Sequence, residues 1–293
     1  MVEERSARPL RHRVVLVPLS AALILGLALS YYGYIWAAPP VNPAELAGAL
    51  AFWTGFVLIV LAFPLRAVLL DFVRSLKTAL GPAVFGAYLA THLLLYGFIL
   101  EGIVTAIHGP QLLGVSTPTL FVYTDTFVPP SIPSALLDLS YNPAIVFTFP
   151  PEFSAALSFY SISMAVVIAV LVVANVVRTR ELGKLCTASK MAKSFVLLPM
   201  VGVALGSSCC LSVAGLVSVY LLPAALADAL ASNLMLYYFT YFVLPAFAVV
   251  VLYLNYVSVA KFSSTLRSHT VGLSLPRTDS TRSLDAAWFE AGA

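Results

Sequence analysis

Residues 153–180 read FSAALSFYSISMAVVIAVLVVANVVRTR, an apolar run without a charged residue that ends at two arginines. A helix needs roughly 20 such residues to cross the hydrocarbon core of a bilayer, which is about 30 Å thick. Backbone amides in lipid must be paired within their own segment, so a helix is the expected conformation. We therefore expect residues 153–177 to span a membrane, with the arginines at its water-facing end.

The whole chain shares the composition of that run. Of its 293 residues, 60% are hydrophobic and only 10% are charged, with a mean hydropathy of +0.95. Soluble domains carry roughly 25% charged residues, so ordinary soluble enzymes and disordered chains are excluded. Three cysteines cannot build a disulfide framework. The net charge of +3 is spread over short flanks, so we expect no nucleic-acid partner.

Five further runs have the length and apolarity of a membrane span. The six expected spans are residues 14–36, 46–69, 82–107, 153–177, 195–222 and 234–257. The fold class is therefore all-α and polytopic, in contact with the lipid bilayer. The chain divides into a basic N-terminus (1–13), spans one to three (14–107), an extracytoplasmic loop (108–152), spans four to six (153–258) and a flexible tail (259–293). The first run is too long for a signal peptide, and we expect it to stay uncleaved.

The basic residues all lie on one side of these spans. The 16 lysines and arginines fall within residues 5–13, 66–77, 178–193 and 261–282. The alternate connections contain none. The positive-inside rule therefore predicts a plasma-membrane protein with both termini in the cytoplasm.

The longest external connection has the composition of an ordered cap. Residues 119–124 and 144–149 are rich in aromatic and β-branched side chains, and prolines separate them. Residues 134–140 are long enough for a turn or two of helix on the membrane interface. We expect an extracytoplasmic cap of partial β character.

Several function classes are excluded by what the spans lack. No lysine lies within a span and no phosphate-binding loop is present. His92 and His108 share one helix at about 24 Å separation, so they cannot ligate one haem from opposite faces. Ser207 and Ser208 have no histidine at a matching depth for a protease. We therefore recognise no catalytic constellation, and we do not expect an enzyme.

The most polar part of a span is the block Gly206, Ser207, Ser208, Cys209 and Cys210. Thiolates prefer soft metal ions, and small residues that interrupt a helix in mid-membrane build binding sites in many transporters. The block resembles the vicinal-cysteine helix of mercuric-ion membrane transport proteins, and that resemblance implies metal transfer by the cysteine pair. The alternative interpretation is close helix packing, which small residues also favour.

His92 lies near mid-depth of the third span, where ionisable residues are costly and suggest function. With Cys209 and Cys210 it would supply one nitrogen and two sulfur ligands to a metal ion. The alternative is a neutral histidine bonded to a neighbouring helix. Glu101 and His108 share a face near the outer end, as a cation-attracting pair or as an ordinary interfacial carboxylate.

These observations favour a permease-like protein that moves a small solute or ion through a mid-membrane site. The first alternative is a non-catalytic subunit of a larger transporter or respiratory complex. Such a subunit would dock through cytoplasmic loops 70–80 and 178–193, where residues 71–80 are expected to form a short helix, or through the outer cap. The second alternative is a thiol-redox enzyme that uses Cys209 and Cys210.

Overall fold

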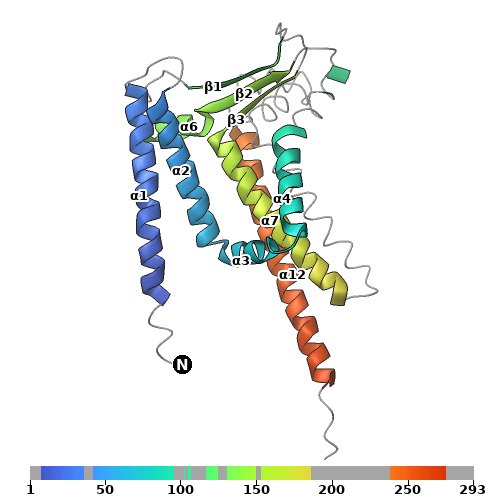
Figure 1. Cartoon of the computed structure of the whole chain (residues 1–293). Coiled ribbons are helices and arrows are strands. Elements are labelled where there is room, and N and C mark those ends of the chain that lie inside the picture. The colour runs from blue at the N-terminus through green and yellow to red at the C-terminus, as the bar shows by residue number, and fades with distance from the viewer. Residues whose placement is uncertain are drawn as a thin grey trace, which may run out of the picture.

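The computed structural model is mostly helical, with a small sheet across one end of the helices (Figure 1). The described residues are 8–35, 42–95, 102, 105–106, 117–124, 131–149, 153–185 and 238–274. The main elements are α1 (Arg8–Ile35), α2 (Pro43–Ala62), α3 (Arg66–Ser75), α4 (Leu80–Ala90), η2 (Thr91–Leu95), β1 (Thr119–Tyr123), α6 (Ile132–Tyr141), β2 (Ala144–Phe149), β3 (Phe153–Ser158), α7 (Phe159–Leu185), η4 (Phe239–Val243) and α12 (Leu244–Ser274).

Four helical stretches within these described residues are long and apolar enough to cross a membrane. They are Val15–Gly33, Pro43–Ala62, Phe159–Gly183 and Phe239–Leu266. They correspond to the first, second, fourth and sixth expected spans. The third expected span is described continuously only as far as residue 95, and the fifth lies wholly outside the described residues. The count of six spans therefore stays a prediction.

Helices α1 and α2 pack as a hairpin because glycines lie at their contact. A Cβ atom at Gly26 or at Gly48 would overlap the backbone of the opposite helix. Small residues of this kind let membrane helices approach closely. Asn42 caps the start of α2, since its Oδ1 accepts from the backbone N–H of Ala44 at 3.0 Å. Its Nδ2 donates to the carbonyl of Gly33 at 2.6 Å, which ties the two helices together.

The second expected span, residues 46–69, is shorter in the structure, because α2 ends at Ala62. Pro64 has no backbone N–H, so it cannot pair with the carbonyl of Val60 as a continuing helix requires. The N–H of Leu65 takes that carbonyl instead, at 3.1 Å. The chain turns here, and α3 runs crosswise from the end of α2 past α7 and α12, both of which continue beyond it (Figure 1).

The short helix that we expect over residues 71–80 begins earlier, at Arg66. Its inward face consists of Val68, Asp71 and Ser75, which recur at helical spacing. The helix packs against α7. The segment that we expect to contact a partner is thus packed against the bundle, and its contact with a partner stays a prediction.

Helix α7 is the centre of the described bundle. It packs against α2, α3, α4 and α12. Of its most apolar 18-residue stretch 78% is buried, compared with 11% of the corresponding stretch of α1. Val167, Ile168 and Leu171 are fully or almost fully buried among side chains of its neighbours. An apolar surface on all sides is what a helix surrounded by other helices needs.

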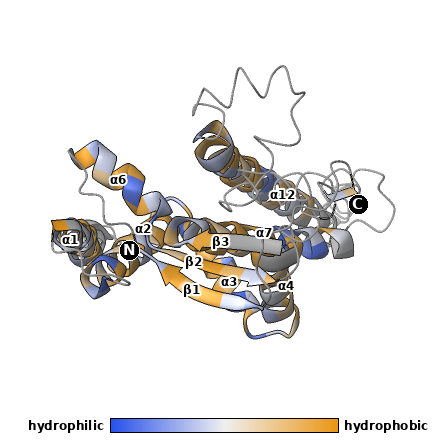
Figure 2. Cartoon of the chain, turned by 90° about the horizontal axis from the view of Figure 1, so that it is seen from above, coloured by the Kyte–Doolittle hydropathy of each residue, from blue (hydrophilic) through white to orange (hydrophobic). Residues whose placement is uncertain are grey.

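The cap contains an antiparallel sheet in the order β1–β2–β3. The strands expected at residues 119–124 and 144–149 are confirmed as β1 and β2, with Thr119 opposite Thr148. The helix expected within residues 134–140 is confirmed as α6. Seen from above, the strands lie over α7 and their ribbons are coloured largely as hydrophobic (Figure 2).

The fourth expected span, residues 153–177, needs a correction at its start. Residues Phe153–Ser158 form β3, which pairs with β2 from Phe149↔Phe153 to Ala144↔Ser158. The helix begins only at Phe159, because the Ser158 hydroxyl accepts from the backbone N–H of Ser161 at 3.1 Å and acts as a helix cap. At the other end of the chain, α12 continues to Ser274, beyond residue 257.

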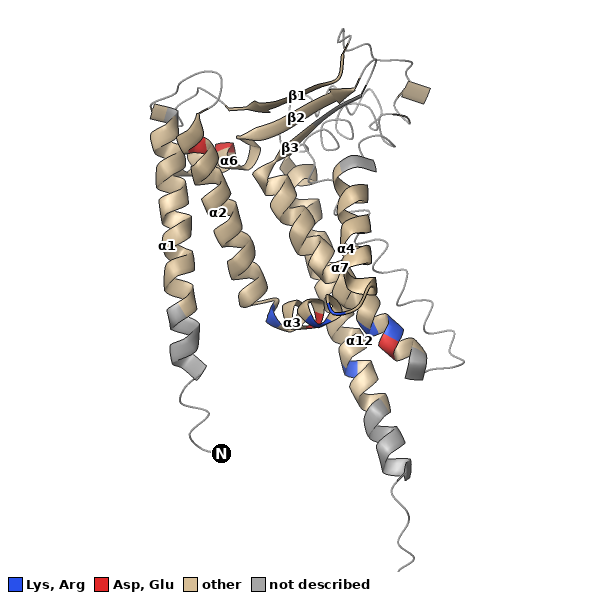
Figure 3. Cartoon of the chain, in the orientation of Figure 1, with Lys and Arg blue, Asp and Glu red and all other residues tan. Residues whose placement is uncertain are grey.

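The described charges are distributed unevenly. The lysines and arginines gather at the end of the bundle away from the sheet (Figure 3). Acidic residues occur both near the sheet and among these cations. The cation-rich end therefore carries ion pairs as well as unbalanced positive charge.

Candidate functional site

Two asparagines join the central helix to α12. Asn175 and Asn255 are almost completely buried. The Asn175 Nδ2 donates to the carbonyls of Leu171 at 2.8 Å and of Leu252 at 3.0 Å. Asn255 in turn donates from its Nδ2 to the Oδ1 of Asn175 at 2.7 Å. Amide groups inside an apolar bundle are costly unless they are bonded in this way.

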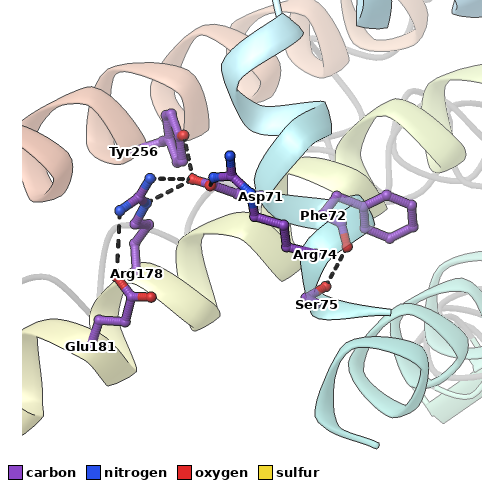
Figure 4. Close-up of polar contacts among 7 residues, drawn as sticks. All are labelled: Asp71, Phe72, Arg74, Ser75, Arg178, Glu181 and Tyr256. Atoms are coloured by element: carbon purple, nitrogen blue, oxygen red, sulfur yellow. Dashed lines mark hydrogen bonds and ion pairs between the residues drawn. The ribbon is translucent and has the colours of Figure 1, made fainter. Parts of the chain in front are cut away.

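A buried ion pair lies close to these asparagines, at the cation-rich end of the bundle. Asp71 is 7% exposed, and its Oδ2 accepts from Arg178 Nε at 2.7 Å and from the Tyr256 hydroxyl at 2.6 Å. Arg178 Nη2 reaches the same oxygen at 2.6 Å, while Arg74 reaches Oδ1 at 3.2 Å. Figure 4 shows that these side chains come from three helices and converge on one carboxylate.

The surroundings of Arg178 complete this network. Its guanidinium carbon lies 5.9 Å from the centre of the Tyr256 ring, within the range of a cation–π contact. Glu181 lies 3.4 Å from the guanidinium, one turn further along α7. The charges of two arginines thus meet those of two carboxylates. These contacts hold α3, α7 and α12 together. Asp71 Oδ2 already accepts from Arg178 and Tyr256, so it has no position left for another ligand.

The second polar centre is built around His92, which is fully buried. The hydroxyl of Tyr88, one turn earlier, lies 2.7 Å from His92 Nδ1. His92 belongs to the π-helical segment η2, which continues α4. π-Helical turns are rare and occur frequently at functional sites. The Tyr88 hydroxyl thus orients the imidazole of His92, a group that carries protons and ligates metal ions in many proteins.

A second π-helical segment, η4, lies beneath the cap and leads directly into α12. It carries Thr240 and Tyr241, both almost fully buried. The Tyr241 hydroxyl donates to the carbonyl of Ser140 at 2.8 Å and accepts from the Ser158 hydroxyl, 2.7 Å away. The Tyr160 hydroxyl donates to the carbonyl of Tyr241 at 3.2 Å. The cap is thereby bonded directly to a π-helical turn.

Aromatic rings surround Tyr241 and complete the join between cap and bundle. The rings of Tyr141 and Tyr241 stack at 5.0 Å between centroids, and Tyr160 lies 4.9 Å from Tyr241. Trp53 packs on Tyr160 and donates from its Nε1 to the carbonyl of Leu139 at 2.9 Å. Residues from α2, α6, α7 and η4 are therefore held in one cluster below the sheet.

The structure tests only part of the site expected from the sequence. Residues 206–210 (Gly206, Ser207, Ser208, Cys209 and Cys210) and Glu101 lie outside the described residues. His92 is described, and its Nδ1 lies 2.7 Å from the hydroxyl of Tyr88 on its own helix. Within the described part of the chain, no three His, Cys, Asp or Glu side chains gather as metal ligands. The metal site of His92, Cys209 and Cys210 stays a prediction.

Sequence reasoning missed the polar residues between α3, α7 and α12. Asn175 was visible as an amide in an otherwise apolar span, three residues before Arg178. Asp71 was visible as a carboxylate on the basic side of the chain. Neither residue type predicts which side chain it will bond, because the bonding partners Asn255 and Tyr256 lie far away in sequence.

Comparison with known proteins adds no relative. No protein-family model, curated protein sequence or solved structure matches this chain. The class that the fold defines is therefore stated from its own features: a mainly helical chain whose described residues include four candidate membrane-spanning helices and a small antiparallel sheet.

Proposed function

We propose that this protein is a permease-like multi-pass membrane protein that moves a small solute or ion. It lies in the plasma membrane with both termini in the cytoplasm. The cation-rich end of the bundle supports this orientation, since basic residues favour the cytoplasmic side. On this proposal the sheet covers the outer ends of the helices.

One observation carries the transport proposal: both described π-helical segments hold fully or nearly fully buried polar side chains. These are His92 on η2, and Thr240 and Tyr241 on η4. Transporters often form their sites where a membrane helix departs from regular geometry. The proposed site joins His92 to the small, polar block Gly206 to Cys210, with Glu101 attracting cations near the outer entrance.

A flux experiment tests this site. Full-length protein is reconstituted in liposomes, with Zn²⁺, Cu⁺ and H⁺ as the probes and a dye inside that reports each ion. We expect His92→Gln to lower flux at least tenfold, and Tyr88→Phe to lower it less, because it removes only the hydrogen bond to Nδ1. The matched control is His269→Gln, near the end of α12, which should transport like the unaltered chain.

The orientation is tested separately. A reporter that works only in the cytoplasm should be active when it is fused after Ala293. An impermeant lysine reagent added to intact cells should not label this protein. External activity of the reporter, or labelling from outside, would overturn the proposed topology. It would also displace every site residue from its proposed depth.

A second candidate function is a non-catalytic subunit, and the cap favours it. The three strands contain no charged residue, while Leu120 is 74% and Phe121 is 49% exposed on opposite faces of β1. Apolar strands of this kind suit a covering partner. If the unaltered chain carries none of the three ions and retains a stoichiometric protein on purification from its native membrane, this candidate replaces the permease.

A further inference from the structure

Helix α3 presents an exposed face that combines cations with apolar side chains. Arg66, Leu70 and Val73 recur at the spacing of one helical face, Arg74 lies beside them, and Lys77 follows in the turn after the helix ends at Ser75. We call these five residues the exposed face of α3. Leu70 is 46% exposed, Val73 is 48% exposed, and the Arg74 side chain is 72% exposed. Arg66 and Lys77 are also exposed.

This face has unbalanced positive charge. The acidic residue of α3, Asp71, lies on the buried side and is already neutralised by Arg178 at 2.6 Å. On this face Arg66 and Lys77 are exposed and have no carboxylate of α3 beside them, and Arg74 adds a third cation. Arg74 also reaches Asp71, at 3.2 Å, while most of its side chain stays accessible.

The helix also lies where lipid headgroups are expected. It runs crosswise from the end of α2 towards the start of α4, past α7 and α12, in the cation-rich part of the bundle (Figures 1 and 3). Interfacial helices bury short apolar side chains among the acyl chains, while lysine and arginine extend towards phosphates. Leu70 and Val73 are short and apolar, and three long cations surround them.

We infer that the exposed face of α3 binds anionic phospholipid headgroups of the inner leaflet. The phosphate oxygens pair with Arg66, Arg74 and Lys77, and Leu70 and Val73 enter the adjacent acyl layer. Anionic lipids attract cations close to the membrane surface, each worth roughly fivefold in binding. This binding holds α3 at the interface, and through Asp71 it also steadies the ends of α7 and α12.

The experiment compares two double variants of the full-length protein in mixed phosphatidylcholine and phosphatidylglycerol nanodiscs. Native mass spectrometry counts the phosphatidylglycerol that each variant retains over phosphatidylcholine. Arg66→Gln with Lys77→Gln removes two cations from the exposed face of α3 and spares Arg74, which contacts Asp71. The matched control, Arg180→Gln with Lys261→Gln, removes two exposed cations of α7 and α12.

We expect the α3 variant to lose at least fivefold of its preference for phosphatidylglycerol, the effect of one cation at an anionic surface, while the control keeps it. Equal loss in both variants, or no loss in either, overturns the proposal. It is also overturned if the unaltered chain retains a stoichiometric protein that only the α3 variant releases. Flux is not measured, so neither result bears on the proposed transport.

A second measurement does not depend on removing charge. Val73→Cys is introduced with Cys186, Cys209 and Cys210 changed to Ser, and the new thiol is labelled with an environment-sensitive dye. Lipids spin-labelled near the headgroup should quench the dye at least twofold more strongly than a water-soluble quencher does. Stronger quenching from water would place α3 away from the bilayer and refute the inference.

Discussion

Asp71→Asn should destabilise the protein more than any other single change in its ion-pair network. The substitution keeps the shape of the side chain and removes its charge. Arg178 then loses the carboxylate that it contacts at 2.6 Å, and Tyr256 loses a charged acceptor at 2.6 Å. The positive charge of Arg178 stays in place, one quarter exposed and without its main counter-charge.

The magnitude follows from the burial of the two partners. Removing one member of a fully buried ion pair costs about 3–5 kcal/mol. The Arg178 side chain is 24% exposed and still meets Glu181 at 3.4 Å, so we expect a smaller cost than that range, about 2–3 kcal/mol. For a chain of this size, that corresponds to a fall in unfolding temperature of about 3–5 °C.

The assay is thermal unfolding of the purified full-length protein in detergent, followed by loss of the monodisperse peak on size-exclusion chromatography. The matched control is Glu181→Gln, which makes the same chemical change on a carboxylate that is 39% exposed and should cost below about 1 kcal/mol. Adding Arg178→Gln to Asp71→Asn should recover part of the loss, because the charges that then lack a partner, on Arg74 and Glu181, are exposed to solvent. If Asp71→Asn and Glu181→Gln unfold at the same temperature, the network does not stabilise the bundle as we argue.

Three further changes can be measured in the same way. Tyr241→Phe removes the hydrogen bonds of its hydroxyl group to Ser140 and Ser158, so it should cost about 1–3 kcal/mol; an unchanged unfolding temperature would mean that these bonds do not hold the cap to the bundle. Asn255→Leu leaves the Oδ1 of Asn175 without its donor, with a similar expected loss. Gly48→Ala should separate α1 from α2, because a Cβ there overlaps backbone atoms, whereas Gly86→Ala meets no atom within 4 Å and should be harmless; equal behaviour of the two would contradict the close packing.

Much of the cap and the approximate positions of four candidate membrane helices could be predicted from local sequence. The strands expected at residues 119–124 and 144–149 are confirmed. They could be predicted because aromatic and β-branched side chains favour strands and prolines separate the two segments. The start of α7 could not be predicted from apolarity. Residues 153–158 are apolar enough for a helix, and only the pairing with β2 makes them a strand.

The candidate site depends still less on local sequence. His92 was identified because an ionisable group in a span is costly wherever its partner lies. One observed partner, Tyr88, is one helical turn away, so a partner on the same helix was available from spacing alone. The hydrogen bond of Asn175 to Asn255, by contrast, requires α7 and α12 to lie side by side.

What the sequence by itself determined is the solvent that each segment prefers. Long uncharged runs must form helices in lipid, because their backbone groups have no other partners there, and the cations are left at one end. What only the tertiary structure decided is which segments meet. Asp71 is 107 residues from Arg178 and 185 residues from Tyr256, and α3 turns across the bundle to reach both. Hydropathy is a property of each residue in its own segment, whereas a buried ion pair exists only after packing has brought distant segments together.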